Sequence, residues 1–233
     1  CGVEVVGGKK KIFITGEITT SAKLNRSIIK RITKRVLKDA GYKTNYKIIV
    51  NISKQSADIA LGVDKGGAGD QGMMYGYATK ETKEMLPLAI VILQKFAKWY
   101  DEERKQNKTL RPDGKAQITG VYDEKKRLQR IQTFLVSYQN DEKNRLVNDG
   151  IIKNKIKELC NCYNIRVDNI IINPTGRFEI GGFEGDSGLT GRKIVVDTYE
   201  GFAKVGGGSL NGKDPSKVDL SGTYKARQIA VRV

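Results

Sequence analysis

Histidine is absent from this sequence and cysteine is scarce. The 233 residues include no histidine and three cysteines, Cys1, Cys160 and Cys162. Without histidine, a His-ligated metal site and a Ser–His or Cys–His catalytic dyad are excluded. Cys160 and Cys162 are too close in sequence for an easy disulfide, and the second pair that a zinc site needs is missing. We therefore expect a reducing, cytoplasmic setting in which any bound metal has oxygen ligands.

Long apolar runs are also missing. The most apolar stretch, Leu86 to Leu93, has eight residues, whereas a membrane span needs about twenty. Residues 1–11 contain no charged region that leads into an apolar one, so we expect no signal peptide there. The sequence starts without methionine and close to a predicted strand, which is compatible with a longer parent chain. We expect a soluble globular protein without membrane contact.

The charge balance is the unusual feature of the composition. Lysine and arginine number 42 against 26 acidic residues, which gives a net charge of +16 and an isoelectric point near 9.7. Such an excess attracts polyanions, either nucleic acid or a concentrated phosphate cluster. The alternative is that the charged side chains only cover helix faces that are exposed to water. For the basic run at residues 30–35 we favour that solvated face.

Hydrophobic periodicity predicts alternating strands and helices. Strands are expected at 12–15, 47–52, 115–122, 130–136 and 169–172, with a turn at 123–126 between two paired strands. Helices are expected at 24–40, 88–105 and 141–159, with these apolar residues on them: Ile28, Ile32 and Val36; Ile92, Phe96, Trp99 and Tyr100; Leu146, Ile152, Ile156 and Leu159. The last two sets should face inward. A glycine-rich loop is expected at 62–76, and helical periodicity disappears over 173–223.

These elements predict an α+β fold in which sheets carry helices on one face. The order of strand, helix and strand, with hairpin strands in between, occurs at least twice in the predicted elements. We expect an N-terminal unit at residues 1–64, a central unit at 65–172 and a partial C-terminal unit at 173–233. The last unit holds the glycine-rich segments, and such segments typically form a binding surface.

One glycine-rich segment, residues 207–214, matches the pattern G-x-x-x-x-G-K. It is not expected to be a P-loop, because Asp214 stands where that loop needs Ser or Thr and no regular buried strand precedes it. Its glycines can still present backbone N–H groups to an anion. Cations for a polyphosphate beside carboxylates for Mg²⁺ favour a nucleotide site, although each alone could form a surface ion pair. The charged residues in question are Lys213, Lys217, Asp219, Asp186, Arg192 and Lys193.

Two more segments have the same mixture of charge and small residues. Residues 66–76 contain one carboxylate, Asp70, among glycines, which is typical of a ligand contact but also of a tight turn. Residues 110–117 place Arg111, Asp113 and Lys115 on alternate positions, hence on one face of an extended strand. That face could contact a ligand or form a structural ladder of ion pairs.

Six segments resemble, in the same order, the signature segments of S-adenosylmethionine synthetases, also called methionine adenosyltransferases. They are GEITTSA at 16–22, GAGDQG at 67–72, RPDGKAQ at 111–117, NPTGRF at 173–178, GDSGLTGRK at 185–193, and the run from GGG at 206–208 to GKDPSKVD at 212–219. The resemblance covers essentially the whole chain. Because six long motifs in register are more specific than one pattern, the chain is identified as a member of this family.

Membership implies a fold, an activity and partners. The fold would be the family's repeated sheet-plus-helix units, with two units and part of a third in this chain. The activity would be synthesis of S-adenosylmethionine from ATP and L-methionine, with hydrolysis of the triphosphate to pyrophosphate and phosphate. The family uses Mg²⁺ on the phosphates and K⁺ as an activator. Its sites lie between two subunits, which implies a homodimer or a higher homo-oligomer.

The resemblance also implies which residues form the site. Lys213, Arg192 and Lys193 would hold the triphosphate, and together with Lys217 they would be the catalytic cations. Asp219 would help to bind Mg²⁺. The other substrate contacts would be Glu17, Gln55, Asp70 and Asp186 in the methionine and ATP pocket, Asp113 and Lys115 at the nucleotide, and Phe178 near the adenine.

The sequence departs from the family pattern at several points. It does not contain the opening Gly-His-Pro-Asp-Lys segment, which has a histidine that assists triphosphate departure, a lysine and a carboxylate for Mg²⁺. The glutamate assigned to K⁺ is expected upstream as well. Asn140 and Val205 stand where histidine is usual, Leu220 stands where arginine is usual, and the loop before Gly69 is short. The third unit stops soon after residues 224–227.

Three explanations stay open for these departures. The chain could be part of a longer enzyme, a compact synthetase whose lost ligands are replaced by other groups or by a partner, or a degenerate paralogue that binds nucleotide or pairs with an active synthetase. We favour an enzyme because the charged cluster is preserved. A basic nucleic-acid-binding protein would explain the charge but not the acidic residues among the glycines, and no stacking platform or recognition helix is evident.

Overall fold

The computed structural model describes residues 1–63 and 66–233. These residues form two compact units that do not follow chain order, because Phe183–Val233 joins Cys1–Ala78 in the first unit and Thr79–Gly182 forms the second. Grouping by contacts therefore differs from the division at 64/65 and 172/173. That division remains a prediction about repeated elements.

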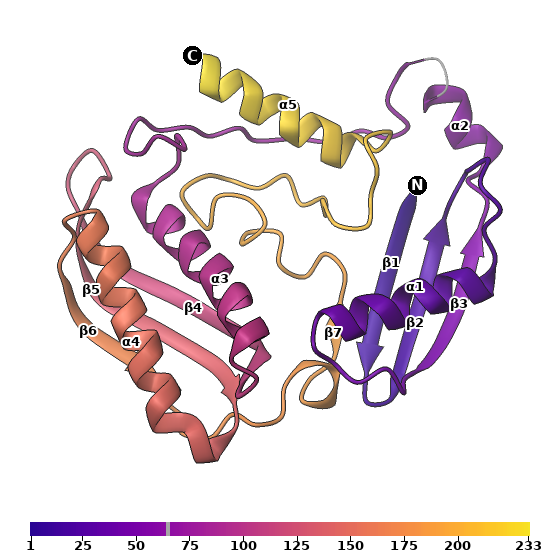
Figure 1. The fold of residues 1–233 in the computed structure, drawn as a ribbon. Coiled ribbons are helices and arrows are strands. Elements are labelled where there is room, and N and C mark those ends of the chain that lie inside the picture. The colour runs from indigo at the N-terminus through magenta and orange to yellow at the C-terminus, as the bar shows by residue number, and fades with distance from the viewer. Residues whose placement is uncertain (64–65) are drawn as a thin grey trace. The chain divides into compact units, whose positions relative to one another are not determined.

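The first unit is built on a four-stranded sheet with the strand order β3-β2-β1-β7 (Figure 1). β1 (Gly2–Gly8) pairs antiparallel with β2 (Lys11–Glu17), which pairs parallel with β3 (Lys47–Ser53). The short β7 (Gly188–Leu189) pairs with β1. α1 (Arg26–Asp39) connects the parallel strands and begins where the Asn25 side chain accepts a hydrogen bond from the Ile28 N–H at 3.0 Å.

α1 covers one face of this sheet through a narrow line of contacts. Leu37 is its buried residue and joins the core of Ile12, Ile14, Ile48 and Val50, with Ile29 packed against it. Ile32 and Val36, two of the periodic residues that predicted the helix, are exposed at 42% and 58%. Successive residues are turned by about 100° around a helix. Ile32 and Val36 lie beside the contact line formed by Ile29 and Leu37, so they remain at the surface although they are apolar.

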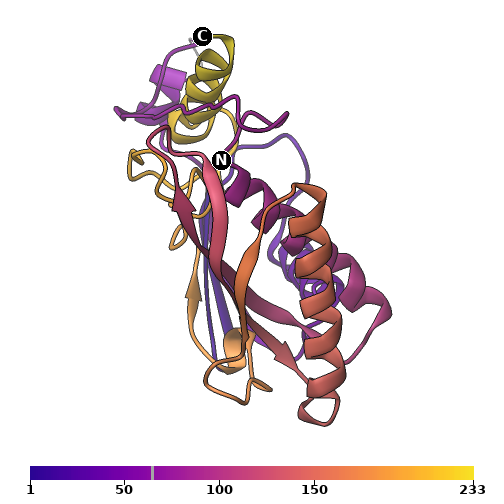
Figure 2. The ribbon, with the colours of Figure 1, turned by 90° about the vertical axis from the view of Figure 1, so that its left-hand side faces the viewer.

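The second unit has a three-stranded sheet with the order β4-β5-β6. β4 (Leu110–Tyr122) and β5 (Leu128–Asn140) form an antiparallel hairpin, and β6 (Val167–Ile172) pairs parallel with β5. α3 (Leu88–Gln106) precedes the hairpin, while a 3₁₀ turn (Glu142–Asn144) and α4 (Arg145–Cys162) connect β5 to β6. Figure 2 shows both helices on the same face of the sheet.

The core of the second unit lies between these helices and the sheet. Phe96 of α3 packs on Phe134 of β5, with ring centroids 5.5 Å apart, and Ile152 and Ile156 of α4 are fully buried. Leu146 is a wrong prediction: it was expected to face inward but is 80% exposed. It lies in the first turn of α4, before the buried face that starts at Asn148.

The two sheets confirm the predicted repetition. Each has an antiparallel hairpin followed by a helix and a parallel third strand, in the orders β1-β2-α1-β3 and β4-β5-α4-β6. Two helices were not predicted, α2 (Ala57–Val63) and α5 (Val218–Arg232). α5 begins inside the range 173–223, where the absence of periodicity predicted no helix. None of its residues is buried, so no apolar face marks it in the sequence.

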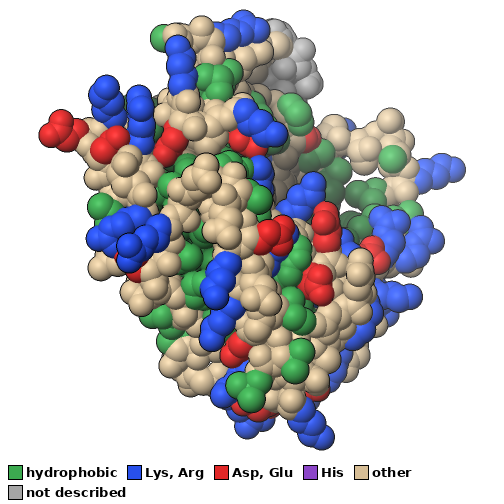
Figure 3. Space-filling model, turned by 60° about the vertical axis from the view of Figure 1, so that its left-hand side comes forward, with side chains coloured by type: hydrophobic (Ala, Val, Ile, Leu, Met, Phe, Trp, Pro, Cys, Tyr) green, Lys and Arg blue, Asp and Glu red, His purple; other side chains and the backbone are tan. Residues whose placement is uncertain are grey.

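Positive charge is dispersed on the one face of the molecule that Figure 3 draws. Figure 3 shows Lys and Arg side chains spread over the visible face, with Asp and Glu between them. Lys30, Arg31, Lys34 and Arg35 are all exposed, which confirms the solvated face predicted for that run. Within the ranges that the structure describes, no helix has the length and apolar character needed to cross a membrane.

Two substitutions on α4 test its orientation. Ile156→Ala should lower the free energy of unfolding by about 2–5 kcal/mol, because Ile156 is fully buried and leaves a cavity. Leu146→Ala should change it by less than about 0.5 kcal/mol, because its side chain is exposed. Urea unfolding measures both values. Equal losses in the two variants would contradict this orientation of α4.

Candidate functional site

A cavity of about 290 Å³ in the first unit collects charged side chains from distant parts of the chain. We call it the first-unit cavity. Its lining comes from β1 and β2, from Gly69 and Asp70, and from residues 213–219. Its charged residues are Glu4, Glu17, Asp70, Lys213, Lys217 and Asp219. Five of these six were predicted as site residues from the sequence.

Backbone pairing brings these segments together. The Val3 N–H donates to the Gly212 carbonyl at 2.7 Å, and Gly2 forms a β-bridge with Lys213. In the β1–β2 hairpin Gly2 stands opposite Glu17. The glycine-rich segment therefore lies along β1 on the end where β2 presents Glu17, and that places Lys213 close to the sheet.

Two ion pairs join four of the six charged residues of this cavity, and Glu4 and Asp70 add two more carboxylates to its lining. Lys213 Nζ lies 2.5 Å from Asp219 Oδ2, and Lys217 Nζ lies 3.8 Å from Glu17 Oε2. A Cβ at Gly208 would stand 2.1 Å from Asp219 Oδ1, so glycine is required there for the carboxylate to take this position. The pairs hold two cations and two carboxylates within reach of one cavity. A bound anion could replace the carboxylates as the partner of the lysines, and a metal cation that enters with it could replace the lysines as the partner of the carboxylates.

The start of α5 also shapes the cavity. Asp219 lies in the first turn of α5, where a negative charge interacts favourably with the helix dipole. Lys217 occupies the N-cap position, and its carbonyl accepts the N–H groups of Leu220 and Ser221. The unpredicted helix thus begins within the predicted motif and fixes the spacing between Lys217 and Asp219.

Four predicted residues of this unit lie outside the lining of the cavity. Arg192 and Lys193 are exposed in the turns that follow β7, and Asp186 is exposed just before it, accepting a hydrogen bond from its neighbour's N–H. Gln55 lies between β3 and α2. Its side-chain Nε2 is buried and has no hydrogen-bond partner among the described atoms.

The remaining predicted residues, Asp113, Lys115 and Phe178, belong to the second unit. Asp113 Oδ2 accepts the Gly182 N–H at 2.7 Å, and the Phe178 carbonyl accepts the Asn140 N–H at 2.9 Å. Lys115 is exposed on β4. A Cβ at Gly181 would stand 2.8 Å from Asp113 Oδ2, so the loop that follows Phe178 comes very close to this carboxylate. Asp113 and Lys115 therefore lie on β4, and Phe178 comes just before the loop that approaches Asp113.

The segment 207–214 is not a P-loop, as expected. Residues 202–205 before it form no strand, and the next helix begins only at Val218. Sequence reasoning missed Glu4 and Ser216, which also line the first-unit cavity. Glu4 could have been found from the alternation of β1, because it lies two residues from Gly2 and thus on the same face.

Metal binding by protein side chains alone is not evident. Across the described ranges, no group of three or more Cys, Asp or Glu residues is arranged to hold a metal ion. Asp219, Glu17 and Asp70 line one cavity but do not form such a group. A metal ion there would need ligands from a bound molecule or from water.

Comparison with known proteins assigns the family. The sequence model of the central domain of S-adenosylmethionine synthetase matches residues 65–178, and that of the C-terminal domain matches residues 180–233. The chain belongs to the S-adenosylmethionine synthetase family. Its α+β fold and the resemblance of its six motifs agree with this assignment.

Curated relatives named S-adenosylmethionine synthase match nearly the whole chain. The protein from Fusobacterium nucleatum is 42% identical over 95% of this chain and 60% of its own length. The Petrotoga mobilis protein is 40% identical over 99% of the chain and 64% of its own length, and the Acholeplasma laidlawii protein is 42% identical over 100% and 65%. This chain thus spans less than two thirds of the length of these synthetases.

Part of the difference in length lies inside the matched region. The alignment with the Acholeplasma laidlawii protein extends over 252 positions, whereas this chain has 233 residues. That synthetase therefore contains residues within the aligned span that this chain lacks. The shortened loop predicted before Gly69 is one candidate place for such a difference.

The first-unit cavity predicts a binding property that does not depend on turnover. Lys213→Ala should weaken the binding of inorganic tripolyphosphate in the presence of Mg²⁺ by about tenfold or more, because a charge-assisted contact is lost. Lys38→Ala is the matched control, since Lys38 is an exposed lysine in the last turn of α1. Isothermal titration calorimetry measures both. A similar loss in the two variants would show that only the net charge matters.

Proposed function

We propose that the protein that carries this chain is a methionine adenosyltransferase, which makes S-adenosylmethionine from ATP and L-methionine. The observation that carries the proposal is the first-unit cavity, where Lys213 and Lys217 lie beside Glu17, Asp70 and Asp219. Family membership supplies the reaction. The methionine sulfur attacks C5′ of the ribose, the whole triphosphate leaves, and it is then hydrolysed to pyrophosphate and phosphate.

The lysines of the cavity are the proposed catalytic cations. Negative charge grows on the leaving triphosphate as its bond to C5′ breaks. Fixed cations stabilise that charge more in the transition state than in the ground state. Lys213 and Lys217 are positioned in the cavity by their pairs with Asp219 and Glu17. Arg192 and Lys193 are proposed to complete the binding of the triphosphate.

This reaction does not require a general base. A thioether sulfur has no proton to lose when it becomes a sulfonium. The absence of histidine therefore does not remove a base that the bond-forming step would need. The residues have only to align the sulfur with C5′, exclude water and stabilise the leaving group.

Mg²⁺ is the proposed divalent cation and Asp219 its proposed ligand. Mg²⁺ is commonly bound through one or two carboxylates together with substrate phosphates and water. A single carboxylate beside a phosphate-binding lysine fits that pattern, and Asp219 contacts Lys213 in the cavity. When bound, the cation would neutralise charge on the phosphates. K⁺ is proposed as an activator, and Glu4 offers a carboxylate of this cavity as its candidate ligand.

The other predicted residues are proposed as further substrate contacts. The carboxylates of Glu17 and Asp70 suit the ammonium group of methionine, and Gln55 and Asp186 are proposed to complete the methionine and ATP pocket. At the nucleotide the proposed contacts are Asp113, Lys115 and Phe178, and the loop after Phe178 closely approaches Asp113.

We propose that the protein acts as a homodimer or a higher homo-oligomer. One row of apolar side chains crosses the sheet of the first unit on the face opposite its core, in the register Leu189, Val6, Phe13 and Ile49. These four side chains are 38–44% exposed. A continuous apolar row at the surface favours burial against another protein surface. A second copy of the chain is the occupant that the family suggests.

A cytoplasmic location is also part of the proposal. Cys1, Cys160 and Cys162 are all free thiols, with Cys162 exposed. Free exposed thiols persist in reducing compartments, where disulfides are rare.

A turnover assay tests the proposed activity. The chain incubated with ATP, L-methionine, Mg²⁺ and K⁺ should form S-adenosylmethionine, detected by mass, and release phosphate. Lys213→Ala should lower kcat/KM by on the order of 10²–10³, as expected for loss of a group that stabilises a developing oxyanion. Lys38→Ala should leave it unchanged. Nucleotide binding without product would contradict the proposal for this chain and leave it a binding role only.

The oligomer can be tested through the apolar row. Phe13→Lys places a charge in the middle of the row and should convert a dimer into a monomer, because a buried unpaired charge is costly. Asn51→Lys is the control, since Asn51 lies on the same face beside the row but outside it. Light scattering after size exclusion gives the mass. A dimer that survives Phe13→Lys would place the interface elsewhere.

A further inference from the structure

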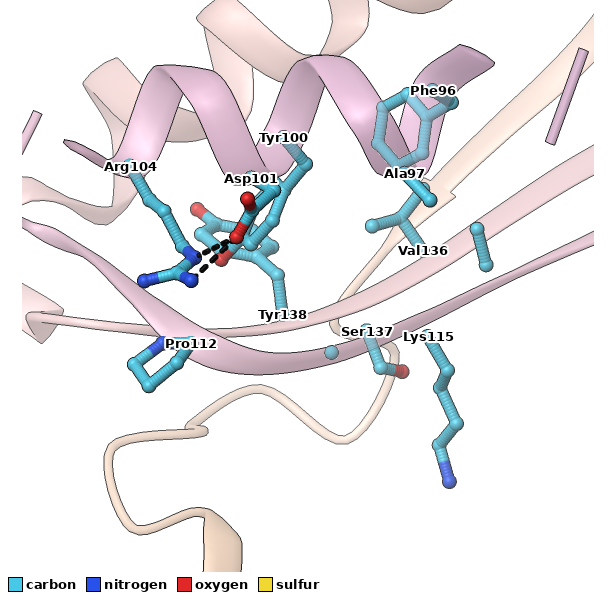
Figure 4. Close-up of a pocket in the computed structure, with 12 residues that line it drawn as sticks. Phe96, Ala97, Tyr100, Asp101, Arg104, Pro112, Lys115, Val136, Ser137 and Tyr138 are labelled. Carbon is cyan, nitrogen blue, oxygen red and sulfur yellow. Dashed lines mark hydrogen bonds and ion pairs between the residues drawn. The ribbon is translucent and has the colours of Figure 1, made fainter. Parts of the chain in front are cut away.

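The second unit contains a pocket of about 210 Å³ between α3 and the β4–β5 hairpin. Figure 4 shows that it has two different ends. Phe96 and Val136 lie at one end, whereas the ion pair of Asp101 and Arg104 lies at the other. Lys115 points away from α3 in this view. Lys115 is still one of the lining residues, so the pocket reaches its position on β4.

An irregularity in β4 accounts for this space. Leu110 pairs with Asn140 and Gly114 pairs with Tyr138, so residues 111–113 stand opposite Gln139 alone. Extra residues in one strand bend it and interrupt the ladder. The pocket is lined there by Pro112 and Gly114, and Ala97 on α3 is too small to fill the gap.

The aromatic walls of the pocket are held in place. Tyr138 donates its hydroxyl to Asp149 Oδ1 at 2.6 Å, and Tyr100 donates its hydroxyl to the Arg111 carbonyl at 2.8 Å. The two rings meet edge to face with centroids 6.3 Å apart. Both hydroxyl groups donate to acceptors that do not line the pocket, so the two rings border it. A site whose walls are already ordered costs little entropy when a ligand binds.

The polar end offers an acceptor beside a donor. Arg104 Nε donates to Asp101 Oδ1 at 2.9 Å, and Lys105 Nζ lies 2.8 Å from Asp101 Oδ2. The hydrogen bonds from Lys105 and Arg104 lower the pKa of Asp101, so this carboxylate is ionised at neutral pH. A primary carboxamide has an N–H donor for such a carboxylate and a carbonyl acceptor for the guanidinium, and it brings no charge of its own.

We propose that this pocket binds a small planar aromatic molecule that carries a primary carboxamide. The ring would lie against Tyr100 and Tyr138, with Phe96 at its far edge, and the carboxamide would meet Asp101 and Arg104. A cavity of about 150 Å³ holds a benzene molecule, so a single substituted ring fits here. A carboxylate in the same place would face Asp101, and an ammonium group would face Arg104.

A ligand bound in the pocket should change how firmly the proposed nucleotide contacts are held. Pro112 and Gly114 line the pocket, and they alternate along β4 with Asp113 and Lys115. A ligand that braces this part of β4 would change how firmly those two side chains are held. This second part rests on the proposed function, whereas binding in the pocket does not.

The fluorescence of Trp99 provides the test of binding. Trp99 is the one tryptophan in the sequence. The centroid of its ring lies 5.6 Å from that of Phe96 and 6.5 Å from that of Tyr100. Titration with benzamide should give a saturable change with a Kd on the order of 1 mM or below, as expected for a ligand of this size. Benzoate, benzylamine and the non-planar cyclohexanecarboxamide should bind at least about tenfold more weakly, because each loses a hydrogen-bonding match or ring contact.

Two variants of α3 locate the binding site. Ala97→Leu fills the pocket and should weaken benzamide binding by about tenfold or more, since a close-packed wall leaves no room for the ring. Gln94→Leu is the control, because Gln94 is exposed on the same helix and does not line the pocket. Thermal melts check that both variants fold. No saturable signal, equal weakening in both variants, or tighter binding of benzoate would overturn the proposal.

A separate measurement tests the coupling between the pocket and ATP binding. Saturating benzamide should change the affinity for ATP with Mg²⁺ in the original chain and in Gln94→Leu, but not in Ala97→Leu. Benzamide binding without any change in ATP affinity would overturn the coupling alone. Loss of ATP binding altogether would count against the proposed function, while the Trp99 titration would still decide whether the pocket binds its ligand.

Discussion

The short backbone pairing between β1 and the glycine-rich segment is the constraint on which the candidate site depends. A hydrogen bond of 2.7 Å from the Val3 N–H to the Gly212 carbonyl and the bridge between Gly2 and Lys213 join residues that are about two hundred positions apart. Without this pairing, Lys213 and Lys217 would have no fixed relation to Glu17. The hairpin register that puts Gly2 opposite Glu17 completes the arrangement.

Both lysines of the first-unit cavity are paired with carboxylates, and this pairing has a functional consequence. Lys213 and Asp219 are partly buried, so each would be costly to leave without a partner. A triphosphate with its Mg²⁺ brings one anion and one cation together and can replace both partners at once. Either ion alone would leave a lysine or a carboxylate unpaired. This pairing is the physical reason for proposing the metal complex of a polyphosphate, and not free phosphate, as the ligand.

β4 serves two purposes in the second unit. Its extra residues open a pocket toward α3, and on the same stretch Asp113 fixes the loop at Gly182 through a hydrogen bond of 2.7 Å. Alternation in the sequence predicts one face for Arg111, Asp113 and Lys115, but it does not predict the extra residues opposite Gln139.

The sequence by itself determined the family, the α+β class, the order of the strands and helices apart from β1, β7, α2 and α5, and the charged residues of the first-unit cavity other than Glu4. These follow from local patterns, namely apolar spacing in β2, α3 and α4 and the glycine-rich motifs around Asp70 and Lys213. Only the tertiary structure decided which apolar residues are buried, so Leu146 and Val36 are exposed although their spacing is helical. It also decided that α5 begins at Val218 and that Arg192 and Lys193 lie outside the cavity lining. The physical reason is that periodicity reports the face of an element, whereas burial and proximity depend on which distant segment packs against that face.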